Sequence, residues 1–400
     1  MACCAPRRLF AYLLGVFYLN DIHETMMQRA LELARRAEGR TSPNPMVGAV
    51  LVKDGRIVGE GFHHQAGAPH AEIEALRAAG EAAHGATLYV NLEPCAHHGR
   101  TPPCTQALIG AGVCKVHYAV GDPNPLVNGK GHTQLEAAGI GVHGGLLEEA
   151  ARKLNLPFYK YITQRRPFVT AKFAMSLDGK IATRSGESLW LTNETSRRRV
   201  HELRDVVDAI LVGTGTVLAD DPQLTTRLDR PDVHHPLRIV ADSRGRVPRS
   251  AQLFEPSLPG KTVLATTAAV DPAHCAKLKA SGVDVWMLPA DTHHRVSLPA
   301  LLNELGRHGL LTLLVEGGSE LLGAFFAGGL VDRVWAFVAP LIIGGQDAPT
   351  PIGGPGVEKL VQALRLGNIE IETLDGDLCI RGDIPQNWQV TPRRMEFMEA

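Results

Sequence analysis

The sequence predicts an α/β protein with two domains. The chain has 400 residues, whereas single hydrophobic cores stop growing near about 250–300 residues. In both halves, short apolar runs typical of strands alternate with segments of helical periodicity. A polar stretch that ends on proline, residues 163–167, separates the halves. The predicted organisation is a non-structural N-terminal extension (1–22), a first domain (23–165), a second domain (166–384) and a C-terminal tail (385–400).

The first half begins with helical periodicity from Glu24 to Ala34 and a proline-containing loop. Two apolar runs, 48–53 and 56–60, are joined by Asp54-Gly55, which predicts a hairpin because both turn positions favour positive φ. The elements predicted after it are a helix (71–79) ended by Gly80, a strand (86–92), a short helix (105–109), a strand (115–120), a helix (133–138), a strand (140–143) and one closing helix (146–161).

The second half has no G-x-G-x-x-G after a strand, so a Rossmann fingerprint is absent. Two glycine-containing loops, 213–216 and 316–319, each follow an apolar run. Such a loop at a helix N-terminus suits a phosphate, although a tight turn is an equal alternative. The predicted elements are strands 168–173, 209–212, 237–241, 262–265, 283–287 and 311–315, and helices 193–205 and 321–326.

Composition narrows the class of protein. The net charge is −1 and aromatic residues make up 5%, so the basic, aromatic surface of a nucleic-acid binder is not expected, nor is attraction to an anionic membrane. Seven scattered cysteines, an odd number, do not indicate a disulfide framework. A reducing compartment fits better, which predicts a cytoplasmic protein.

The first twenty residues resemble the start of a signal peptide, because Arg7 and Arg8 precede an apolar run, 9–19. The run is shorter than the roughly 20 residues that span a bilayer, and no small-residue cleavage site follows. A non-structural extension, with Met26 or Met27 as the effective start, is favoured over a targeting signal.

Four residues of the first half predict a zinc site. One histidine and two cysteines, His70, Cys95 and Cys104, leave a fourth tetrahedral position for water, whose pKa zinc lowers toward about 7. Glu72 is not needed as a ligand and would act as general acid and base. The zinc deaminase signature is H-x-E…P-C-x-x-C, but eight residues separate the cysteines here. A structural zinc site is the alternative, although such sites usually have four protein ligands.

These motifs, together with residues 43–48, 91–104 and 122–125, resemble the bifunctional deaminase/reductase family of riboflavin biosynthesis, in which the long spacer between the cysteines is characteristic. The resemblance implies a cytidine-deaminase-like three-layer α/β domain. Its implied reaction is the zinc-dependent hydrolytic deamination of 2,5-diamino-6-(5-phosphoribosylamino)pyrimidin-4(3H)-one. The implied substrate contacts are Asn44, His97 and Arg100.

The resemblance extends to residues 172–192, 216–222 and 315–318. It implies a dihydrofolate-reductase-like α/β domain that uses NADPH to reduce the ribosyl group of 5-amino-6-(5-phosphoribosylamino)uracil to ribityl. The implied NADPH contacts are Ala174, Trp190, Thr216, Asp220, Ser243, Gly318, Ser319, Glu320, Leu321, Leu322, Gly323 and Ala324. The implied substrate contacts are Lys172, Ser188, Arg204, Leu224, Arg227 and Glu316.

Three points stay open on the sequence alone. Ser243 and Arg244 would suit a 2′-phosphate but the adjacent Asp242 would disfavour it, so NADPH rather than NADH depends on the resemblance. A cytidine or guanine deaminase fused to an unrelated domain, and a nucleic-acid editing deaminase, are the rival enzymes. The long spacer and Arg100 oppose the first, and the balanced charge opposes the second.

The expected partners are small-molecule substrates. A homo-oligomer is expected as the general default for soluble enzymes.

Overall fold

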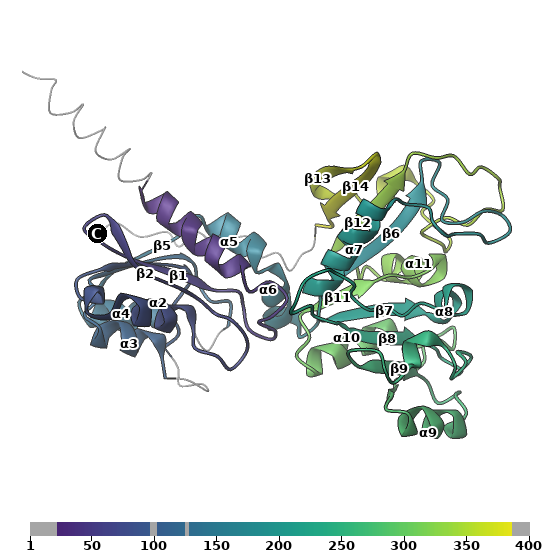
Figure 1. Cartoon of the computed structure of the whole chain (residues 1–400), viewed down its shortest axis with the longest axis horizontal. Helices are drawn as coiled ribbons and strands as arrows, with labels where there is room; N and C mark the ends of the chain where they lie inside the picture. The colour runs from purple at the N-terminus through teal and green to yellow at the C-terminus, as the bar shows by residue number, and fades with distance from the viewer. Residues whose placement is uncertain (1–21, 97–101, 125–127, 386–400) are drawn as a thin grey trace, which may run out of the picture. The chain divides into compact units, whose positions relative to one another are not determined.

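The computed structural model describes residues 22–96, 102–124 and 128–385. The chain divides into two compact units, with the division between Thr163 and Gln164. Both units are α/β, as Figure 1 shows. The predicted N-terminal extension and C-terminal tail lie almost wholly outside the described residues. Within the described ranges, none of the helices has the length and apolarity that crossing a bilayer requires.

The first unit is built on a five-stranded sheet of order β2-β1-β3-β4-β5. β1 runs antiparallel to both of its neighbours, and β3, β4 and β5 run parallel to one another. The predicted hairpin is confirmed, because Asp54 and Gly55 have φ angles of 49° and 73° between the first two strands. The strands are β1 (Gly48–Lys53), β2 (Arg56–Phe62), β3 (Thr87–Leu92), β4 (Lys115–Val120) and β5 (Gly141–Gly144).

Helices cover both faces of this sheet, which makes three layers (Figure 1). One face packs against α2, α3 and α4 through buried side chains such as Leu88, Leu108 and Leu135. The helix over residues 22–35 and α5 lie on the other face. The numbered helices are α2 (Ala71–Ala79), α3 (Cys104–Gly110), α4 (Lys130–Ala137), α5 (Glu148–Leu154) and α6 (Leu156–Gln164), with a 3-10 turn η1 (Gly80–Ala83).

The single closing helix predicted over 146–161 is wrong, because the structure has two helices, α5 and α6, with Asn155 between them. Pro157 has no N–H to donate to the carbonyl group four residues earlier, so an uninterrupted helix would lose a hydrogen bond there. Asn155 has left the helical conformation, with φ −107° and ψ 21°. Its side chain is bonded to a distant part of the chain.

The second unit contains a nine-stranded sheet of order β10-β9-β8-β7-β11-β6-β12-β14-β13. The strands from β10 to β12 run parallel, and β14 and β13 add an antiparallel edge. The strands are β6 (Phe168–Ser176), β7 (Ala209–Gly213), β8 (Leu237–Ala241), β9 (Thr262–Thr266), β10 (Asp284–Met287), β11 (Thr312–Val315), β12 (Arg333–Ala339), β13 (Gly367–Leu374) and β14 (Asp377–Asp383).

The predicted strands of this unit are confirmed to within a few residues, but β12, β13 and β14 were not predicted. β13 alternates isoleucine with glutamate, and its isoleucine side chains are exposed. The strand therefore lacks the alternation of buried apolar and exposed polar residues that identifies a strand in a sequence. The helices are α7 (Glu194–Val206), α8 (Thr214–Asp220), α9 (Pro272–Ala280), α10 (Leu298–Arg307) and α11 (Ser319–Ala327), with 3-10 turns η2 (Gln252–Phe254) and η3 (Leu360–Gln362).

A row of aromatic side chains crosses the first unit's sheet under the helix over residues 22–35. The rings of Tyr89 and His117 stack at 5.1 Å, and those of His117 and His143 at 4.9 Å. His23 covers this row, with its ring 4.6 Å from that of His117 and its Nδ1 2.6 Å from the Tyr89 hydroxyl. Burial, followed by the charges of His23, His143 and Lys115, lowers the pKa of His117 to about 4.

This row predicts a loss of stability in mild acid. The ordinary pKa of histidine is 6.5, so between about pH 6.5 and 4 the unfolded chain binds a proton at His117 that the folded chain does not. Stability therefore falls as the pH falls through that window. His117 is only half-buried, and after allowance for solvent screening we expect a loss of about 1–2 kcal/mol.

The measurement is the urea midpoint of unfolding at pH 7.5 and pH 5 for wild type and His117→Phe, which keeps the stack but does not titrate. Wild type should lose more stability between the two pH values than the variant does. An equal loss in both proteins would mean that other groups carry the acid sensitivity.

Candidate functional site

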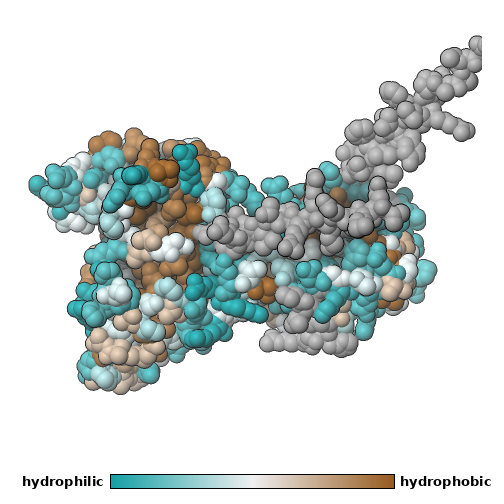
Figure 2. All heavy atoms as spheres, turned by 180° about the vertical axis from the view of Figure 1, so that it is seen from behind, coloured by the Kyte–Doolittle hydropathy of each residue, from teal (hydrophilic) through white to brown (hydrophobic). Residues whose placement is uncertain are grey.

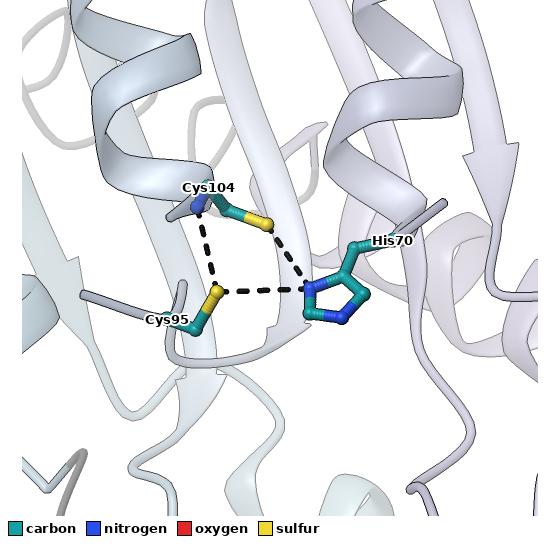
Figure 3. Close-up of side chains that lie close together, drawn as sticks. All are labelled: His70, Cys95 and Cys104. Atoms are coloured by element: carbon teal, nitrogen blue, oxygen red, sulfur yellow. Dashed lines mark hydrogen bonds between the residues drawn. The ribbon is translucent and has the colours of Figure 1, made fainter. Parts of the chain in front are cut away.

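The three predicted metal ligands converge at one point of the first unit (Figure 3). His70 is the N-cap of α2, Cys95 lies three residues after β3, and Cys104 is the first residue of α3. His70 Nδ1 is 3.2 Å from Cys104 Sγ and 3.6 Å from Cys95 Sγ. The three ligand atoms lie within 4.8 Å of one another, so a single ion could contact all of them.

The chemistry of this donor set fits zinc. The pKa of the Cys95 thiol is lowered by hydrogen bonds from the Cys104 side chain and His70, and by the Cys104 N–H at 3.4 Å. A thiolate is the form of cysteine that binds metals. One imidazole nitrogen and two sulfurs are ordinary zinc ligands, and a three-ligand set leaves one position open. His70, Cys95 and Cys104 would therefore hold Zn²⁺.

Glu72 lies beside this cluster in the first turn of α2, with 4% of its surface exposed. Burial, followed by the negative charge at Cys95, raises its pKa to about 7. The Cys104 side chain opposes this rise of the pKa in part. A carboxyl group with such a pKa exchanges protons readily at neutral pH.

Asn44 is held close to the metal ligands by a histidine that the sequence analysis did not select. The Nδ1 of His63 is 3.0 Å from the Pro69 carbonyl oxygen, which can only accept, so Nδ1 carries the proton. Its Nε2 therefore accepts from the Asn44 amide at 3.0 Å. Burial lowers the pKa of His63.

The hairpin register could have identified this pair. Gly48 is paired with Phe62, so the residues just before β1 lie opposite those just after β2, and the His63 N–H donates to the Val47 carbonyl at 2.9 Å. The other two predicted substrate contacts, His97 and Arg100, lie outside the described residues.

In the second unit, three of the predicted substrate residues form a buried charge cluster. Arg204 donates to both oxygens of Glu316, at 2.8 and 2.9 Å, and Lys172 Nζ lies 3.6 Å from the same carboxylate. Burial opposes the charge on Glu316, but Arg204 and Lys172 overcome it and hold its pKa at about 2. Burial lowers the pKa of Lys172.

A cavity of about 590 Å³ adjoins this cluster. Arg197, which was not predicted, also lines it, donates to the Thr192 carbonyl at 2.6 Å and lies 4.6 Å over the ring of Trp190. Arg227 lines the same wall, and its backbone N–H donates to His201. The predicted residues that line this cavity are Lys172, Ala174, Ser188, Trp190, Arg204, Asp220 and Arg227.

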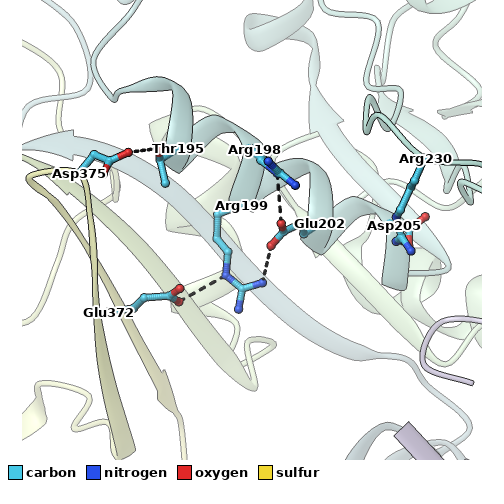
Figure 4. A network of polar contacts seen from close by, with 8 residues as sticks. All are labelled: Thr195, Arg198, Arg199, Glu202, Asp205, Arg230, Glu372 and Asp375. Carbon is cyan, nitrogen blue, oxygen red and sulfur yellow. Dashed lines mark hydrogen bonds and ion pairs between the residues drawn. The ribbon is translucent and has the colours of Figure 1, made fainter. Parts of the chain in front are cut away.

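The helix α7 carries Arg197 and Arg204 and is anchored by the polar contacts drawn in Figure 4. Arg199 contacts Glu202 on the same helix at 2.9 Å and Glu372 of β13 at 3.3 Å. At the ends of the helix, Thr195 bonds to Asp375, and Asp205 pairs with Arg230. These contacts fix the helix that presents the arginines to the cavity.

A second cavity, of about 620 Å³, lies where the two predicted glycine loops meet. The N–H of Gly318 donates to the Thr216 hydroxyl at 2.9 Å, which joins the loops. Arg244, Arg246 and Arg295 are among the residues that line the cavity, and Arg295 pairs with Glu320 at 3.5 Å. The predicted residues that line this cavity are Thr216, Ser243, Gly318, Ser319, Glu320, Leu321 and Ala324.

Asp242 does not line this cavity. It is fully buried, and its carboxylate accepts the N–H groups of Val247 at 2.7 Å and Arg244 at 3.3 Å. The Asp242 carboxylate therefore stabilises the loop and does not face the cavity. The concern that Asp242 would repel a 2′-phosphate bound there no longer applies.

Four predicted contacts of the second unit line neither of these cavities: Glu316, which belongs to the buried charge cluster, and Leu224, Leu322 and Gly323. The Leu224 and Leu322 side chains belong to the hydrophobic core. A side chain at Gly323 would meet the Gly353 carbonyl oxygen at 2.3 Å, so this glycine serves close packing. Leu224, Leu322 and Gly323 therefore contribute to packing beside the cavities rather than to their linings.

Comparison with known families matches both units. Residues 20–120 match the cytidine and deoxycytidylate deaminase zinc-binding region. Residues 167–380, more than half of the chain, match the RibD C-terminal domain.

Near full-length relatives agree with these matches. The riboflavin biosynthesis protein RibD of Actinobacillus pleuropneumoniae is 46% identical over 354 residues, which are 88% of this chain and 93% of that protein. RibD of Escherichia coli K12 is 43% identical over 368 residues, which are 89% of this chain and 98% of that protein.

Two solved structures resemble the whole chain. Acinetobacter baumannii RibD, form 1, has a TM-score of 0.82 at 41% identity and covers 92% of this chain and 100% of its own. A diaminohydroxyphosphoribosylaminopyrimidine deaminase/5-amino-6-(5-phosphoribosylamino)uracil reductase of Thermotoga maritima has a TM-score of 0.80 at 36% identity, with coverage of 92% and 99%.

Proposed function

The chain belongs to the RibD family of riboflavin biosynthesis proteins, and on that premise we propose which residues carry out its two reactions. The protein is a bifunctional enzyme with a cytidine-deaminase-like domain followed by a dihydrofolate-reductase-like domain. The first deaminates 2,5-diamino-6-(5-phosphoribosylamino)pyrimidin-4(3H)-one with Zn²⁺. The second reduces the ribosyl group of 5-amino-6-(5-phosphoribosylamino)uracil with NADPH.

In deamination, His70, Cys95 and Cys104 would hold Zn²⁺, which when bound lowers the pKa of a water molecule toward about 7. Glu72 would take up a proton as water adds to the ring carbon and would deliver it to the departing amino group, which leaves as ammonia. Asn44 orients the pyrimidine ring, because His63 fixes its amide. The buried Glu72 carboxyl group against the ligand cluster is the observation that carries this part.

In reduction, NADPH when bound supplies a hydride to C1′ of the sugar. The change also requires a proton on the ring oxygen as the C1′–oxygen bond breaks. We assign Lys172 as the donor of this proton. Its ammonium group lies 3.6 Å from the Glu316 carboxylate, and the residue lines the 590 Å³ cavity. Arg227 and Arg197 supply positive charge for the substrate phosphate, and the arginine-lined cavity of 620 Å³ would take NADPH.

The experiment that tests both assignments follows NADPH oxidation and ammonia release by the purified, zinc-loaded protein. The diaminopyrimidinone substrate should release ammonia before NADPH is consumed, and the deaminated substrate should consume NADPH without ammonia. Ammonia release with no oxidation of NADPH would refute the reductase half. If neither product forms, the substrate assignment is wrong, and a structural zinc domain becomes the better description of the first half.

We also propose that the enzyme is a homodimer through β13. Ile369 and Ile371 of this strand are 58% and 66% exposed, and Leu360 and Val361 of η3 are each 86% exposed. Figure 2 shows apolar residues gathered over the upper part of the second unit. β13 ends its sheet in the described chain, and two copies of one edge strand can pair about a two-fold axis.

Light scattering at micromolar concentration should give the mass of a dimer for wild type and of a monomer for Ile371→Lys. A monomeric wild type would refute the interface.

The proposed location is the cytoplasm, where the thiols of the zinc site stay reduced. Recovery of the protein in an extracytoplasmic fraction would count against this location.

A further inference from the structure

The side chain of Asn155, between α5 and α6, bonds to one residue 109 positions earlier in the chain. Its Oδ1 accepts the Met46 N–H at 2.8 Å, and its Nδ2 donates to the Met46 carbonyl at 2.9 Å. Asn155 is 2% exposed. A buried amide in a low-dielectric site holds such a pair of bonds strongly, because water does not compete for them.

A second buried amide binds the same stretch of backbone. Asn91 of β3 donates to the Met46 carbonyl at 3.0 Å and accepts the Gly48 N–H at 2.8 Å. Two side chains therefore replace a β-ladder in fixing the backbone just before β1. Residues 43 and 45 are prolines without an N–H group, so Met46 offers the first donor between Asn44 and the strand.

Met46 lies two residues after Asn44, and the other end of this loop is tied to the metal site. The Asn44 side chain bonds to His63, and His63 bonds to the carbonyl of Pro69, the residue before the ligand His70. The loop is held at Met46 by Asn155 together with Asn91, and at Asn44 by His63. Loss of either hold would let Asn44 move relative to the metal ligands.

We propose that Asn155 is a positioning residue for deamination, acting through the Met46 peptide to place Asn44 against the pyrimidine ring. The proposal rests on the deaminase function proposed above. It also accounts for the interruption between α5 and α6, because a residue within a continuous helix could not present both atoms of its side-chain amide to Met46.

The test is a double-mutant cycle with Asn155→Asp and Asn44→Ala, read as kcat/KM for ammonia release. Aspartate has the same shape, and its ionised carboxylate still accepts the Met46 N–H but cannot donate to the Met46 carbonyl. We expect Asn155→Asp to lower kcat/KM about 10–100-fold, mainly through KM, with zinc content and the rate on the deaminated substrate unchanged. In the Asn44→Ala background the same change should cost less than about threefold.

Equal losses in both backgrounds, loss of zinc, or wild-type kcat/KM in the single variant would each overturn the proposal. If Asn155→Asp does not fold, the smaller and neutral Asn155→Ser takes its place in the same cycle. Wild type is measured first, so a failure of the proposed deaminase function shows before any variant is compared.

Discussion

Replacing Glu72 with glutamine is expected to lower kcat for deamination by about 10²–10⁴-fold, the range for loss of a general acid and base. Glutamine keeps the shape and the burial of the side chain but cannot accept the proton of the attacking water. The measurement is ammonia release by zinc-loaded protein from the diaminopyrimidinone substrate. The same preparation should reduce the deaminated substrate at the wild-type rate, which shows that the rest of the protein is intact.

Glu74→Gln is the matched control, because Glu74 lies on the same helix and pairs with Arg77 at the surface at 2.9 Å. Its rate should stay within about twofold of wild type. If Glu72→Gln were as active as this control, a purely structural zinc site would describe the first domain better than a catalytic one.

Replacing Glu316 with glutamine should abolish measurable reduction and destabilise the second unit. The change leaves Arg204 and Lys172 as buried cations without their carboxylate, and breaking a buried ion pair costs about 3–5 kcal/mol. Reduction is measured as NADPH oxidation with the deaminated substrate, and stability as the free energy of unfolding in urea. Deamination should stay close to the wild-type rate.

Glu304→Gln provides the comparison, because Glu304 pairs with the exposed Arg307 on a single helix. A surface pair of this kind contributes about 0–1 kcal/mol. If the two variants were equally stable, the cluster around Glu316 would not be the compensated buried charge that the geometry indicates.

The metal site was predictable because its signals are local. His70 and Glu72 are two residues apart, and each cysteine adjoins prolines at the boundary of an element. The contact between Arg204 and Glu316 joins residues 112 positions apart, and only the family resemblance connected them beforehand. Charged residues at that separation carry no sign in the sequence that they are buried together.

The errors of prediction have different origins. Pro157 was a local sign of the break that the predicted helix overlooked, whereas nothing near Asn155 in the sequence shows that its amide bonds to Met46. His63 was not selected, because a single histidine is uninformative until the register of the hairpin places it opposite Asn44. β13 was not predicted because its isoleucines are exposed like its polar residues. A strand without a buried face lacks the alternation of apolar and polar residues that identifies strands in a sequence.

The contact between His23 and the first unit's sheet bears on how the gene is expressed. Initiation at Met26 or Met27, the start favoured from the sequence, would remove the ring that covers His117 and the nitrogen that lies 2.6 Å from the Tyr89 hydroxyl. A recombinant chain trimmed to either methionine would keep every predicted catalytic residue and yet lose the first turn of its opening helix. We expect such a chain to be less stable in storage than one that keeps His23, with its catalytic chemistry unchanged.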